Sequence, residues 1–289
     1  MKRILYLNGR FVAASAASVS AEDRGLLYGD GLFETVRIYH GRPFALDRHL
    51  WRLRQAGERV RMRIPGSRRW WEAILSELLR RNRLDGKDAA VRVTITRGVG
   101  GVGLLPPRRT RQTILASANR ISSELGEWQR RGVAVVLLPF SPGSDAFLTG
   151  IKTTDYLTAL IGKAMARERD AFEGIYCSRD GRVLEGTTTN VFVIHGKQLL
   201  APPVESGILP GITRAQVLRI ARRIGLEPHE RAIRIRDLEL ADEAFLTAST
   251  IEIVPIATVD RKPIGLRGHH PKTDELRRLF HRLATGARR

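Results

Sequence analysis

Three kinds of side chain in the second half of this 289-residue chain could act together in one reaction. Lys152 precedes an apolar-faced segment, Glu185 ends a strand-like run, and Thr213 stands at a predicted helix start. An amine at a helix start meets an unfavourable dipole, and such amines react with carbonyl groups. A carboxylate keeps a pyridine nitrogen protonated, and the N–H groups that open a helix suit a phosphate. Together these groups would hold a phosphorylated ring compound that carries an aldehyde.

The phosphate half of this hypothesis rests on two short runs. Leu209, Gly211 and Ile212 lead into the helix at Thr213, and the glycine lets the backbone come close to a ligand. Ser249 and Thr250 end a predicted strand and would add hydroxyl groups to the same pocket. Each signal alone has an ordinary explanation, since lysines are mostly solvated and proline commonly opens a helix. Only the conjunction points to a site.

Composition limits the classes of protein that fit. The chain has 49 Lys and Arg against 30 Asp and Glu, and 43% of its residues are hydrophobic, as in a globular protein. Arginines are spread along the chain, with runs at residues 52–63, at 80–83 and at 222–223, and there is no basic tail or paired Cys/His metal spacing. We therefore expect no nucleic-acid partner and no metal.

The N-terminus and the cysteine content bear on location. The apolar run after Arg3 stops at Asn8-Gly9, a hairpin signal, and is too short for a signal peptide or a membrane span. Cys177 is the only cysteine, so no internal disulfide can form, and it is expected in the core. We expect a cytoplasmic protein without membrane contact.

The elements that must position these residues form an α+β pattern. Residues 33–39 alternate as a strand, apolar residues at helical spacing follow in 46–60 and 71–79, and strands are expected at 91–95 and 114–118. The later part is rich in antiparallel strands, and its helices are expected after Lys152, at 213–224 and at 274–283. The predicted division is a small domain at 1–118, a linker at 119–132 and a large domain at 133–289.

The order of these motifs resembles the fold-type IV pyridoxal phosphate (PLP) enzymes. That family includes branched-chain aminotransferases, D-amino acid aminotransferases and aminodeoxychorismate lyases. The resemblance rests on the lysine, on a glutamate 33 residues later in Glu-Gly-Thr-Thr-Thr-Asn-Val-Phe, and on Leu-Pro-Gly-Ile-Thr-Arg. Tyr-Gly-Asp-Gly-Leu-Phe-Glu at 28–34 and His-Leu-Trp-Arg-Leu at 49–53 extend it over nearly the whole chain. It implies a two-domain fold with the cofactor between the domains, and a homodimer in which the small domain reaches the neighbour's site.

The resemblance assigns roles to individual residues. Lys152 matches the lysine that forms the Schiff base with PLP and moves the substrate proton, and Glu185 matches the partner of the pyridine nitrogen. Arg52 matches the phosphate-binding arginine, and Leu209 matches a leucine packed on the ring. The amides of Ile212 and Thr213 and the position of Ser249 complete the phosphate site, while Tyr156 is expected near the ring hydroxyl.

The reaction is less clearly indicated, because the motifs conflict. Tyr28, Phe33 and Arg37 match the branched-chain type, as does the glycine-rich loop at 98–103. The loop after Thr96-Arg97-Gly98 lacks the arginine and histidine with which D-amino acid aminotransferases hold the substrate carboxylate. Val102 replaces an arginine that is common in the lyases, yet the three threonines after Gly186 resemble the D-amino acid and lyase groups.

These features predict a PLP-dependent class IV aminotransferase that acts on an amino acid and a 2-oxo acid. Branched-chain L-amino acids are favoured and D-amino acids stay open, with Arg37 and the amides near Thr250 as candidate carboxylate holders. One alternative is aminodeoxychorismate lyase, which releases pyruvate and 4-aminobenzoate on the same fold. Another is a non-catalytic, arginine-rich binding protein, in which Lys152 would have no function.

Overall fold

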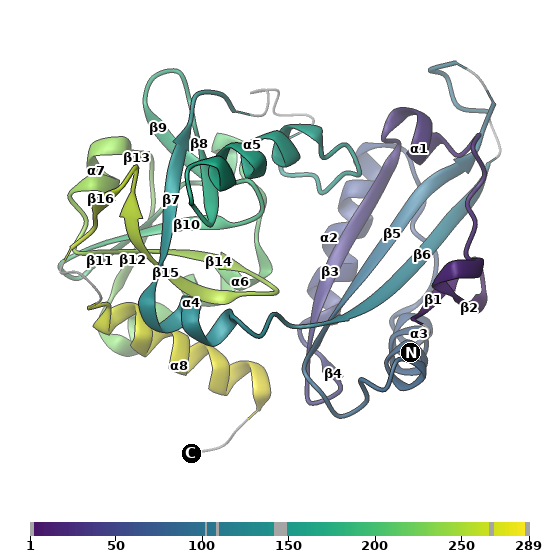
Figure 1. The fold of residues 1–289 in the computed structure, drawn as a ribbon, viewed down its shortest axis with the longest axis horizontal. Helices are drawn as coiled ribbons and strands as arrows, with labels where there is room; N and C mark the ends of the chain where they lie inside the picture. The colour runs from purple at the N-terminus through teal and green to yellow at the C-terminus, as the bar shows by residue number, and fades with distance from the viewer. Residues whose placement is uncertain (1–2, 102, 108–109, 142–148, 266–268, 287–289) are drawn as a thin grey trace. The chain divides into compact units, whose positions relative to one another are not determined.

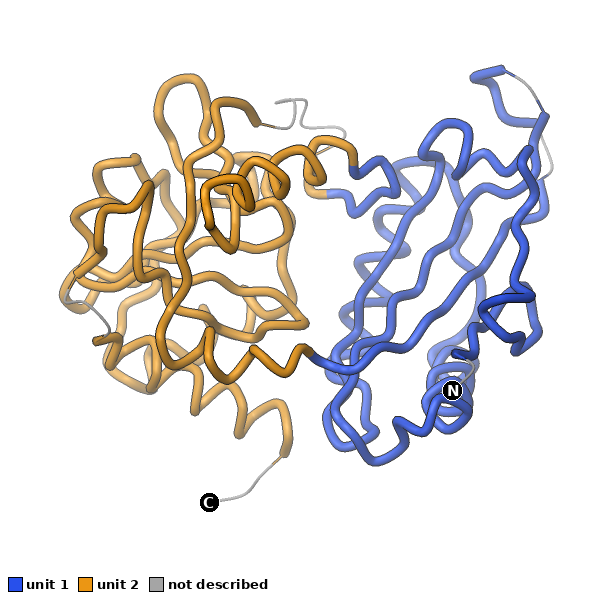
Figure 2. Tube along the Cα trace, viewed as in Figure 1, with its two compact units in different colours: residues 1–121, 151–156 blue, residues 122–150, 157–289 orange. Residues whose placement is uncertain are grey.

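The computed structural model describes residues 3–101, 103–107, 110–141, 149–265 and 269–286 (Figure 1). Val102, in the glycine-rich loop, lies outside these residues. The chain forms two compact units, residues 1–121 with 151–156 and residues 122–150 with 157–289 (Figure 2). These bounds differ from the predicted division at 118 and 133, because residues 151–156 return to the first unit and the expected linker contains a helix, α4 (Leu125–Arg131). Leu125 and Gln129 of that helix are buried.

The first unit is built on a six-stranded antiparallel sheet in the order β2-β1-β6-β5-β3-β4. Its strands are β1 (Ile4–Leu7), β2 (Arg10–Ala13), β3 (Gly31–Tyr39), β4 (Arg42–Pro43), β5 (Ala89–Val99) and β6 (Arg111–Arg120). Its helices are η1 (Ala14–Ala16), α1 (Arg24–Tyr28), α2 (Leu46–Arg59) and α3 (Arg68–Arg81).

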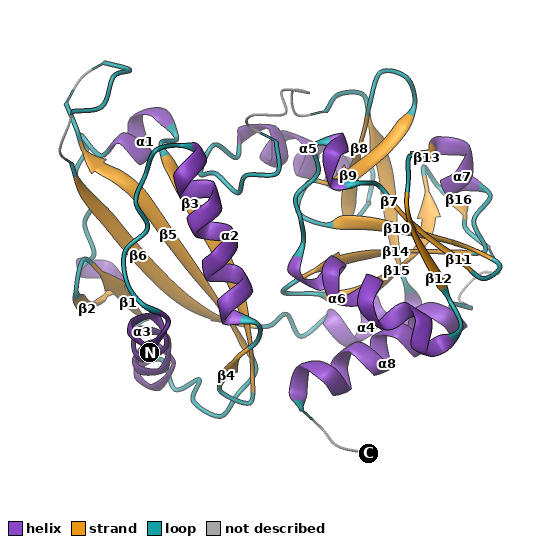
Figure 3. Ribbon diagram, turned by 180° about the vertical axis from the view of Figure 1, so that it is seen from behind, coloured by secondary structure: helices purple, strands orange, loops and turns teal. Residues whose placement is uncertain are grey.

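Helices α2 and α3 cover one face of this sheet, as Figure 3 shows for α2. Leu50 and Leu53 of α2 and Trp71 of α3 pack with Leu32 and Val36 of β3 in one buried cluster. Side chains alternate across a strand, so the even-numbered residues of β3 face these helices and the odd-numbered ones face the other side. The predicted alternation along this strand is confirmed, and it sorts the candidate site residues onto two faces.

The second unit contains ten strands, of which six close into a ring. The ring runs β9-β10-β14-β15-β7-β8 and closes where Glu185 of β9 pairs with Asn190 of β10. The strands are β7 (Val133–Leu138), β8 (Glu173–Cys177), β9 (Arg182–Gly186), β10 (Asn190–His195), β11 (Gln198–Ala201), β12 (Glu227–Glu230), β13 (Ile233–Arg234), β14 (Glu243–Ala248), β15 (Glu252–Val259) and β16 (Lys262–Pro263). Most pairs are antiparallel, as expected, but β7 runs parallel to both β15 and β8, and β11 runs parallel to β12.

The remaining helices of the second unit are α5 (Leu157–Glu168), η2 (Val204–Ser206), α6 (Ile212–Ala221), η3 (Arg222–Ile224), α7 (Ile235–Glu239) and α8 (Pro271–Thr285). Within the part of the chain that the structure describes, no helix is long and apolar enough to cross a membrane. Helix α5 contacts β7 and β8 through small side chains, with Gly162 and Ala166 buried. A Cβ at Gly162 would lie 2.7 Å from Leu138, so this approach requires glycine. The apolar stripe at Leu157, Leu160 and Ile161 is exposed.

Candidate active site

Lys152 lies in an extended segment that pairs with the start of β3. Its carbonyl oxygen accepts a hydrogen bond from the Phe33 amide at 2.9 Å, and the Thr154 amide donates to the Gly31 carbonyl at 2.9 Å. Helix α5 begins only at Leu157, so the prediction that Lys152 opens a helix is wrong. The backbone groups that would start that helix are used by β3, and the helix dipole therefore does not act on this lysine as expected.

Aromatic rings surround the Lys152 amine within the first unit. Nζ lies 4.4 Å from the centre of the Phe33 ring and 5.8 Å from the centre of the Tyr156 ring. The two rings meet edge to face, with their centres 5.2 Å apart. Ring faces attract a cation and exclude water, so the amine is held beside an apolar wall.

Arg92, which the sequence analysis missed, belongs to the same cluster. Its guanidinium carbon lies 3.5 Å from the centre of the Phe33 ring. Arg92 pairs with Thr35 across β5 and β3, which places it on the face that carries Phe33 and Arg37. Burial lowers the pKa of Arg92. The sequence signal was the alternation in β5, which sets Arg92 opposite to its buried apolar neighbours.

Arg37 and Tyr28, the other candidate substrate residues of the first unit, have clear partners. The buried Arg37 forms an ion pair with Asp88, with Nη2 3.0 Å from Oδ2. The Tyr28 hydroxyl accepts a hydrogen bond from the Gly103 amide at 2.9 Å. Arg24 donates to the carbonyl oxygens of Gly103 and Leu104, both at 2.8 Å, so this loop is fixed to α1.

Arg52 lies on the helix-covered face of the sheet, in a buried ionic network. Its Nε donates to Glu34 Oε1 at 2.7 Å and its Nη2 donates to Oε2 at 2.8 Å, while His49 Nδ1 lies 2.8 Å from Oε2. Burial raises the pKa of the Glu34 carboxyl, but Arg52 and His49 outweigh it and hold the pKa at about 2. Arg52 therefore binds the strand through Glu34, an even-numbered residue of β3, a contact that the motif spacing did not predict.

Glu185 is fixed at the point where the ring of strands in the second unit closes. Its Oε2 accepts hydrogen bonds from Asn190 Nδ2 at 3.1 Å and from the Leu209 amide at 3.0 Å. The same Asn190 Nδ2 donates to the Leu209 carbonyl at 2.9 Å. The structure thus brings together Glu185 and the backbone of Leu209, and Asn190 is the residue that joins them.

The start of α6 follows directly from Leu209. Gly211 is the N-cap residue, without a side-chain cap, and a Cβ there would lie 2.0 Å from Asn190 Oδ1. Ile212 and Thr213 form the first turn of the helix, and the Thr213 side chain is buried. The predicted helix start is confirmed, and the phosphate site expected here stays a prediction that rests on the free N–H groups of such a start.

Thr247 adds a polar group that the sequence analysis did not select. It pairs with Asn190 across β14 and β10, so its side chain lies on the same sheet face as Asn190. Its hydroxyl oxygen is buried and has no hydrogen-bond partner among the described residues. Ser249 and Thr250 follow in the turn after β14, and both are half-buried.

The three threonines between Gly186 and Asn190 form hydrogen bonds with a different carboxylate, that of Glu173. Their hydroxyl groups donate to the fully buried Glu173, at 2.5 Å from Thr187, 2.9 Å from Thr188 and 3.3 Å from Thr189. This network fixes the turn between β9 and β10, and with it the positions of Glu185 and Asn190. Cys177 is partly buried, and burial raises its thiol pKa to about 11.

The predicted site residues divide between the units. Lys152, Arg52, Tyr156, Tyr28, Phe33 and Arg37 belong to the first unit, and Glu185, Leu209, Gly211, Ile212, Thr213, Ser249 and Thr250 belong to the second. The described residues contain no group of His, Cys, Asp and Glu suited to a metal ion. These residues offer an amine, the three guanidinium groups of Arg37, Arg52 and Arg92, a fixed carboxylate and a helix start.

Comparison with protein families finds one match over most of the chain. The model of the amino-transferase class IV family matches residues 31–259. A putative branched-chain-amino-acid aminotransferase of Methanocaldococcus jannaschii is 36% identical, over 97% of this chain and 96% of its own length. An aminodeoxychorismate lyase of Bacillus subtilis is 32% identical, over 91% and 88%, and a D-alanine aminotransferase of Bacillus licheniformis is 33% identical, over 92% of each chain.

Solved structures give the same result for the fold. The branched-chain amino acid aminotransferase of Escherichia coli superposes with a TM-score of 0.92 at 28% identity, covering 100% of this chain and 97% of the other. The branched-chain aminotransferase of the archaeon Thermoproteus uzoniensis with norvaline gives 0.89 at 27% identity, covering 99% and 96%. A further branched-chain amino acid aminotransferase, solved with pyridoxamine 5'-phosphate, gives 0.91 at 27% identity, covering 100% and 96%. The expected fold-type IV architecture is therefore confirmed.

Proposed function

The chain belongs to the class IV aminotransferases and is a PLP-dependent transaminase, and we propose that it transfers an amino group between a branched-chain L-amino acid and a 2-oxo acid. The observation that carries the substrate proposal is the contact of both the Lys152 amine and the Arg92 guanidinium with the Phe33 ring, which also meets Tyr156. Aromatic rings suit an apolar substrate side chain, and a guanidinium suits its carboxylate.

The residues of the second unit fit pyridoxal phosphate, the cofactor of this family. The α6 start at Gly211 presents backbone N–H groups, and the buried Thr247 hydroxyl lacks a partner among the described residues. We assign the phosphate to Ile212, Thr213 and Ser249, with Arg52 as its guanidinium partner and Thr250 beside it. Leu209 would pack against the cofactor ring, and Tyr156 would lie near the ring hydroxyl.

The chain's own residues then provide the acid–base chemistry. Bound PLP supplies an electron sink for the substrate's Cα electrons. Glu185 holds a proton at the ring nitrogen, since Asn190 and the Leu209 amide keep its carboxylate in place. Lys152 removes the proton from the substrate Cα, and the rings of Phe33 and Tyr156 exclude water from its amine.

We assign the substrate carboxylate to Arg92, together with Arg37 and the amides at Thr250. Arg92 is favoured because Asp88 already neutralises Arg37, whereas Arg92 lies against the Phe33 ring, which the lysine amine also contacts. Tyr28 contributes indirectly, since its hydroxyl group holds the Gly103 amide of the glycine-rich loop.

We further propose that the enzyme is a homodimer in the cytoplasm. Leu26 of α1 is 69% exposed, and Leu104 and Leu105 of the loop that Arg24 fixes are 82% and 90% exposed. An ordered apolar surface of this kind supports a protein contact, and the exposed stripe at Leu157, Leu160 and Ile161 is a second one. The single cysteine suits a reducing compartment.

The test is the visible absorption of the PLP-loaded protein, titrated separately with L-leucine, L-glutamate and D-alanine. We expect L-leucine and L-glutamate to bleach the band and D-alanine to leave it unchanged. Bleaching by D-alanine alone would overturn the proposed stereochemistry.

A second reaction, elimination of pyruvate from aminodeoxychorismate, is favoured by the Bacillus subtilis relative and by the Glu-Gly-Thr-Thr-Thr-Asn block. If no amino acid bleaches the absorption band and the protein releases 4-aminobenzoate, the protein is a lyase instead.

A further inference from the structure

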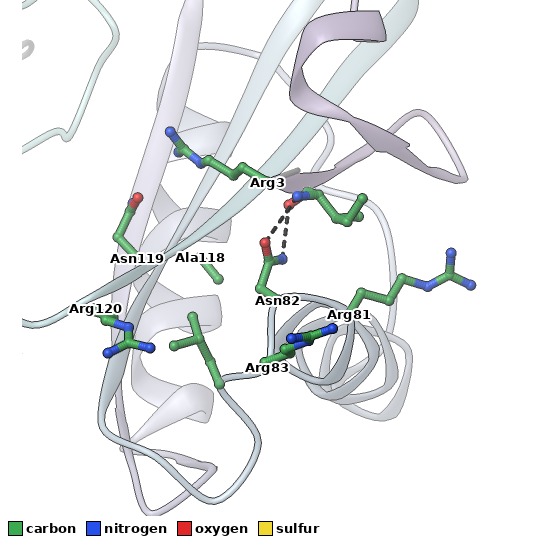
Figure 4. Close-up of a pocket in the computed structure, with 9 residues that line it drawn as sticks. Arg3, Arg81, Asn82, Arg83, Ala118, Asn119 and Arg120 are labelled. Atoms are coloured by element: carbon green, nitrogen blue, oxygen red, sulfur yellow. Dashed lines mark hydrogen bonds between the residues drawn. The ribbon is translucent and has the colours of Figure 1, made fainter. Parts of the chain in front are cut away.

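A cleft of about 420 Å³ lies in the first unit where β1, the end of α3 and the end of β6 meet. Four of its lining residues are arginines, Arg3, Arg81, Arg83 and Arg120, and no aspartate or glutamate lines it (Figure 4). The sequence showed an arginine cluster at 80–83, and the proposed transaminase chemistry makes no use of it.

The floor of this arginine cleft is rigid. Asn82 Oδ1 accepts a hydrogen bond from the Ile4 amide at 3.0 Å, and its Nδ2 donates to the Ile4 carbonyl at 2.9 Å and to the Leu78 carbonyl at 2.8 Å. Leu84 and Ala118 are buried beneath it. The arginines are therefore set around a fixed, partly apolar surface, and Figure 4 shows their guanidinium groups extending from it.

Nearby carboxylates are already occupied. Glu77 binds the guanidinium groups of Arg80 and Arg81, with contacts of 2.7 Å and 2.6 Å, and Asp85 also interacts with Arg80. Within the described ranges no ion pair involves Arg3, Arg83 or Arg120. Three exposed guanidinium groups thus line one cleft without an acidic partner, and their combined charge attracts anions.

Arg83 also has a backbone conformation that disfavours arginine. It follows the last turn of α3 with a φ of 58°, in the left-handed region where glycine commonly ends a helix. A residue other than glycine in this region stores a small backbone strain. Here its guanidinium belongs to the arginine cleft.

The cleft is separate from the Lys152 cluster of the same unit. In the sheet, Ile38 pairs with Ala89 and Ala89 pairs with Arg120, whereas Lys152 lies beside Gly31 and Phe33. The two places are therefore at opposite ends of β3.

We propose that the arginine cleft binds an oligophosphate group, either as free tripolyphosphate or as the phosphate chain of a nucleotide. A lone carboxylate has two oxygens and one charge, enough for one guanidinium fork. An oligophosphate carries several charges spread along a chain and can engage more than one of Arg3, Arg83 and Arg120.

The test is calorimetric titration of the PLP-loaded enzyme, whose cofactor site is filled, with tripolyphosphate, ATP and adenosine in turn. We expect one site per chain for tripolyphosphate and for ATP, and no binding of adenosine. Equal affinities for tripolyphosphate and ATP would show that the cleft recognises the phosphate chain alone. Tighter binding of ATP would show that the apolar floor also binds the nucleoside. Absence of saturable binding by either phosphate overturns the proposal.

Arg83→Gly and Arg120→Ala test the residues. Each should weaken binding about tenfold, the effect of one lost charge-assisted contact, and leave transaminase turnover unchanged. Glycine suits the φ at this position, so Arg83→Gly will fold. Arg69→Ala is the matched control, since it removes an exposed arginine of α3 that lies outside the cleft. If it weakens binding as much as the other two, diffuse charge accounts for the affinity and the site is disproved.

Discussion

The carboxylate of Glu34 on strand β3 accepts two hydrogen bonds from the guanidinium of Arg52, with Nε 2.7 Å from Oε1 and Nη2 2.8 Å from Oε2. Both side chains are buried, so the planar group of Arg52 has one orientation. An arginine proposed to bind a phosphate is thereby positioned before its ligand arrives.

Glu34→Gln should destabilise the first unit strongly. Removing one partner of a buried ion pair leaves the charge of Arg52 uncompensated, at a cost of about 3–5 kcal/mol. Urea unfolding measures this loss, and PLP affinity should fall with it. Glu77→Gln is the control, because its partners Arg80 and Arg81 are exposed and water replaces the lost contact. Equal destabilisation by the two changes would disprove the role of burial.

The same carboxyl makes stability depend on acidity. The pKa of Glu34 is about 2 in the folded chain against an ordinary 4.5. Because this pKa is lowered on folding, the ionised carboxylate adds about 3 kcal/mol to the free energy of unfolding. This contribution is complete above pH 4.5 and disappears as the pH falls toward 2. Unfolding curves between these pH values should show this slope in the native protein and a shallower one in Glu34→Gln.

Arg92→Ala should raise the KM for L-leucine about 10- to 100-fold, because a carboxylate loses a charge-assisted partner. The matched substrate is 3-methylbutylamine, which keeps the apolar side chain and lacks the carboxylate. Its slow reaction with the bound cofactor should be unchanged in the variant. If the variant reacts equally more weakly with L-leucine and with 3-methylbutylamine, Arg92 supports Phe33 and does not hold the carboxylate.

Asn190→Ala should loosen Glu185 and the Leu209 backbone together, because one amide nitrogen binds both. We expect PLP affinity to fall about tenfold, measured by cofactor loss on dialysis. Thr188→Val tests the specificity of the effect, since it removes one of the hydroxyl groups on Glu173 and leaves Asn190 in place. Retention of PLP by Asn190→Ala at the native level would contradict this linkage.

Leu105→Glu should weaken the proposed homodimer. A leucine that is 90% exposed in the single chain contributes about 1.5–3 kcal/mol when a partner buries it, and a carboxylate reverses this. Sedimentation velocity at several concentrations measures the change. Leu240→Glu is the control, since Leu240 is 63% exposed and belongs to the other unit. An unchanged sedimentation coefficient in Leu105→Glu would exclude the loop from the contact.

Local sequence patterns predicted the helices and strands well. Alternation of side chains predicted β3 and β5, and helical spacing of apolar residues predicted α2 and α3. The Pro-Gly-Ile-Thr run predicted the start of α6. These features depend on neighbours in sequence, and the residues carry the signal themselves.

Partners distant in sequence were not predicted. Lys152 looked like a helix start, but its backbone pairs with β3, more than a hundred residues earlier. The apolar face after Lys152 was predicted, but its exposure was not: Leu157 and Leu160 are exposed, and the side of α5 that carries Gly162 packs on the strands. Arg92 and Glu34 had no motif that named their partners, since alternation fixes a face and not the side chain across it.

The return of residues 151–156 to the first unit has a consequence for how such a chain can be cut and recombined. The polypeptide passes between the units at residues 121, 150 and 156, so no single breakpoint separates them. A gene fragment for residues 122–289 would encode Lys152 without the strand that orders it, and one for residues 1–121 would lack the lysine. Chimeras with other transaminases should therefore keep residues 151–156 and β3 from the same parent.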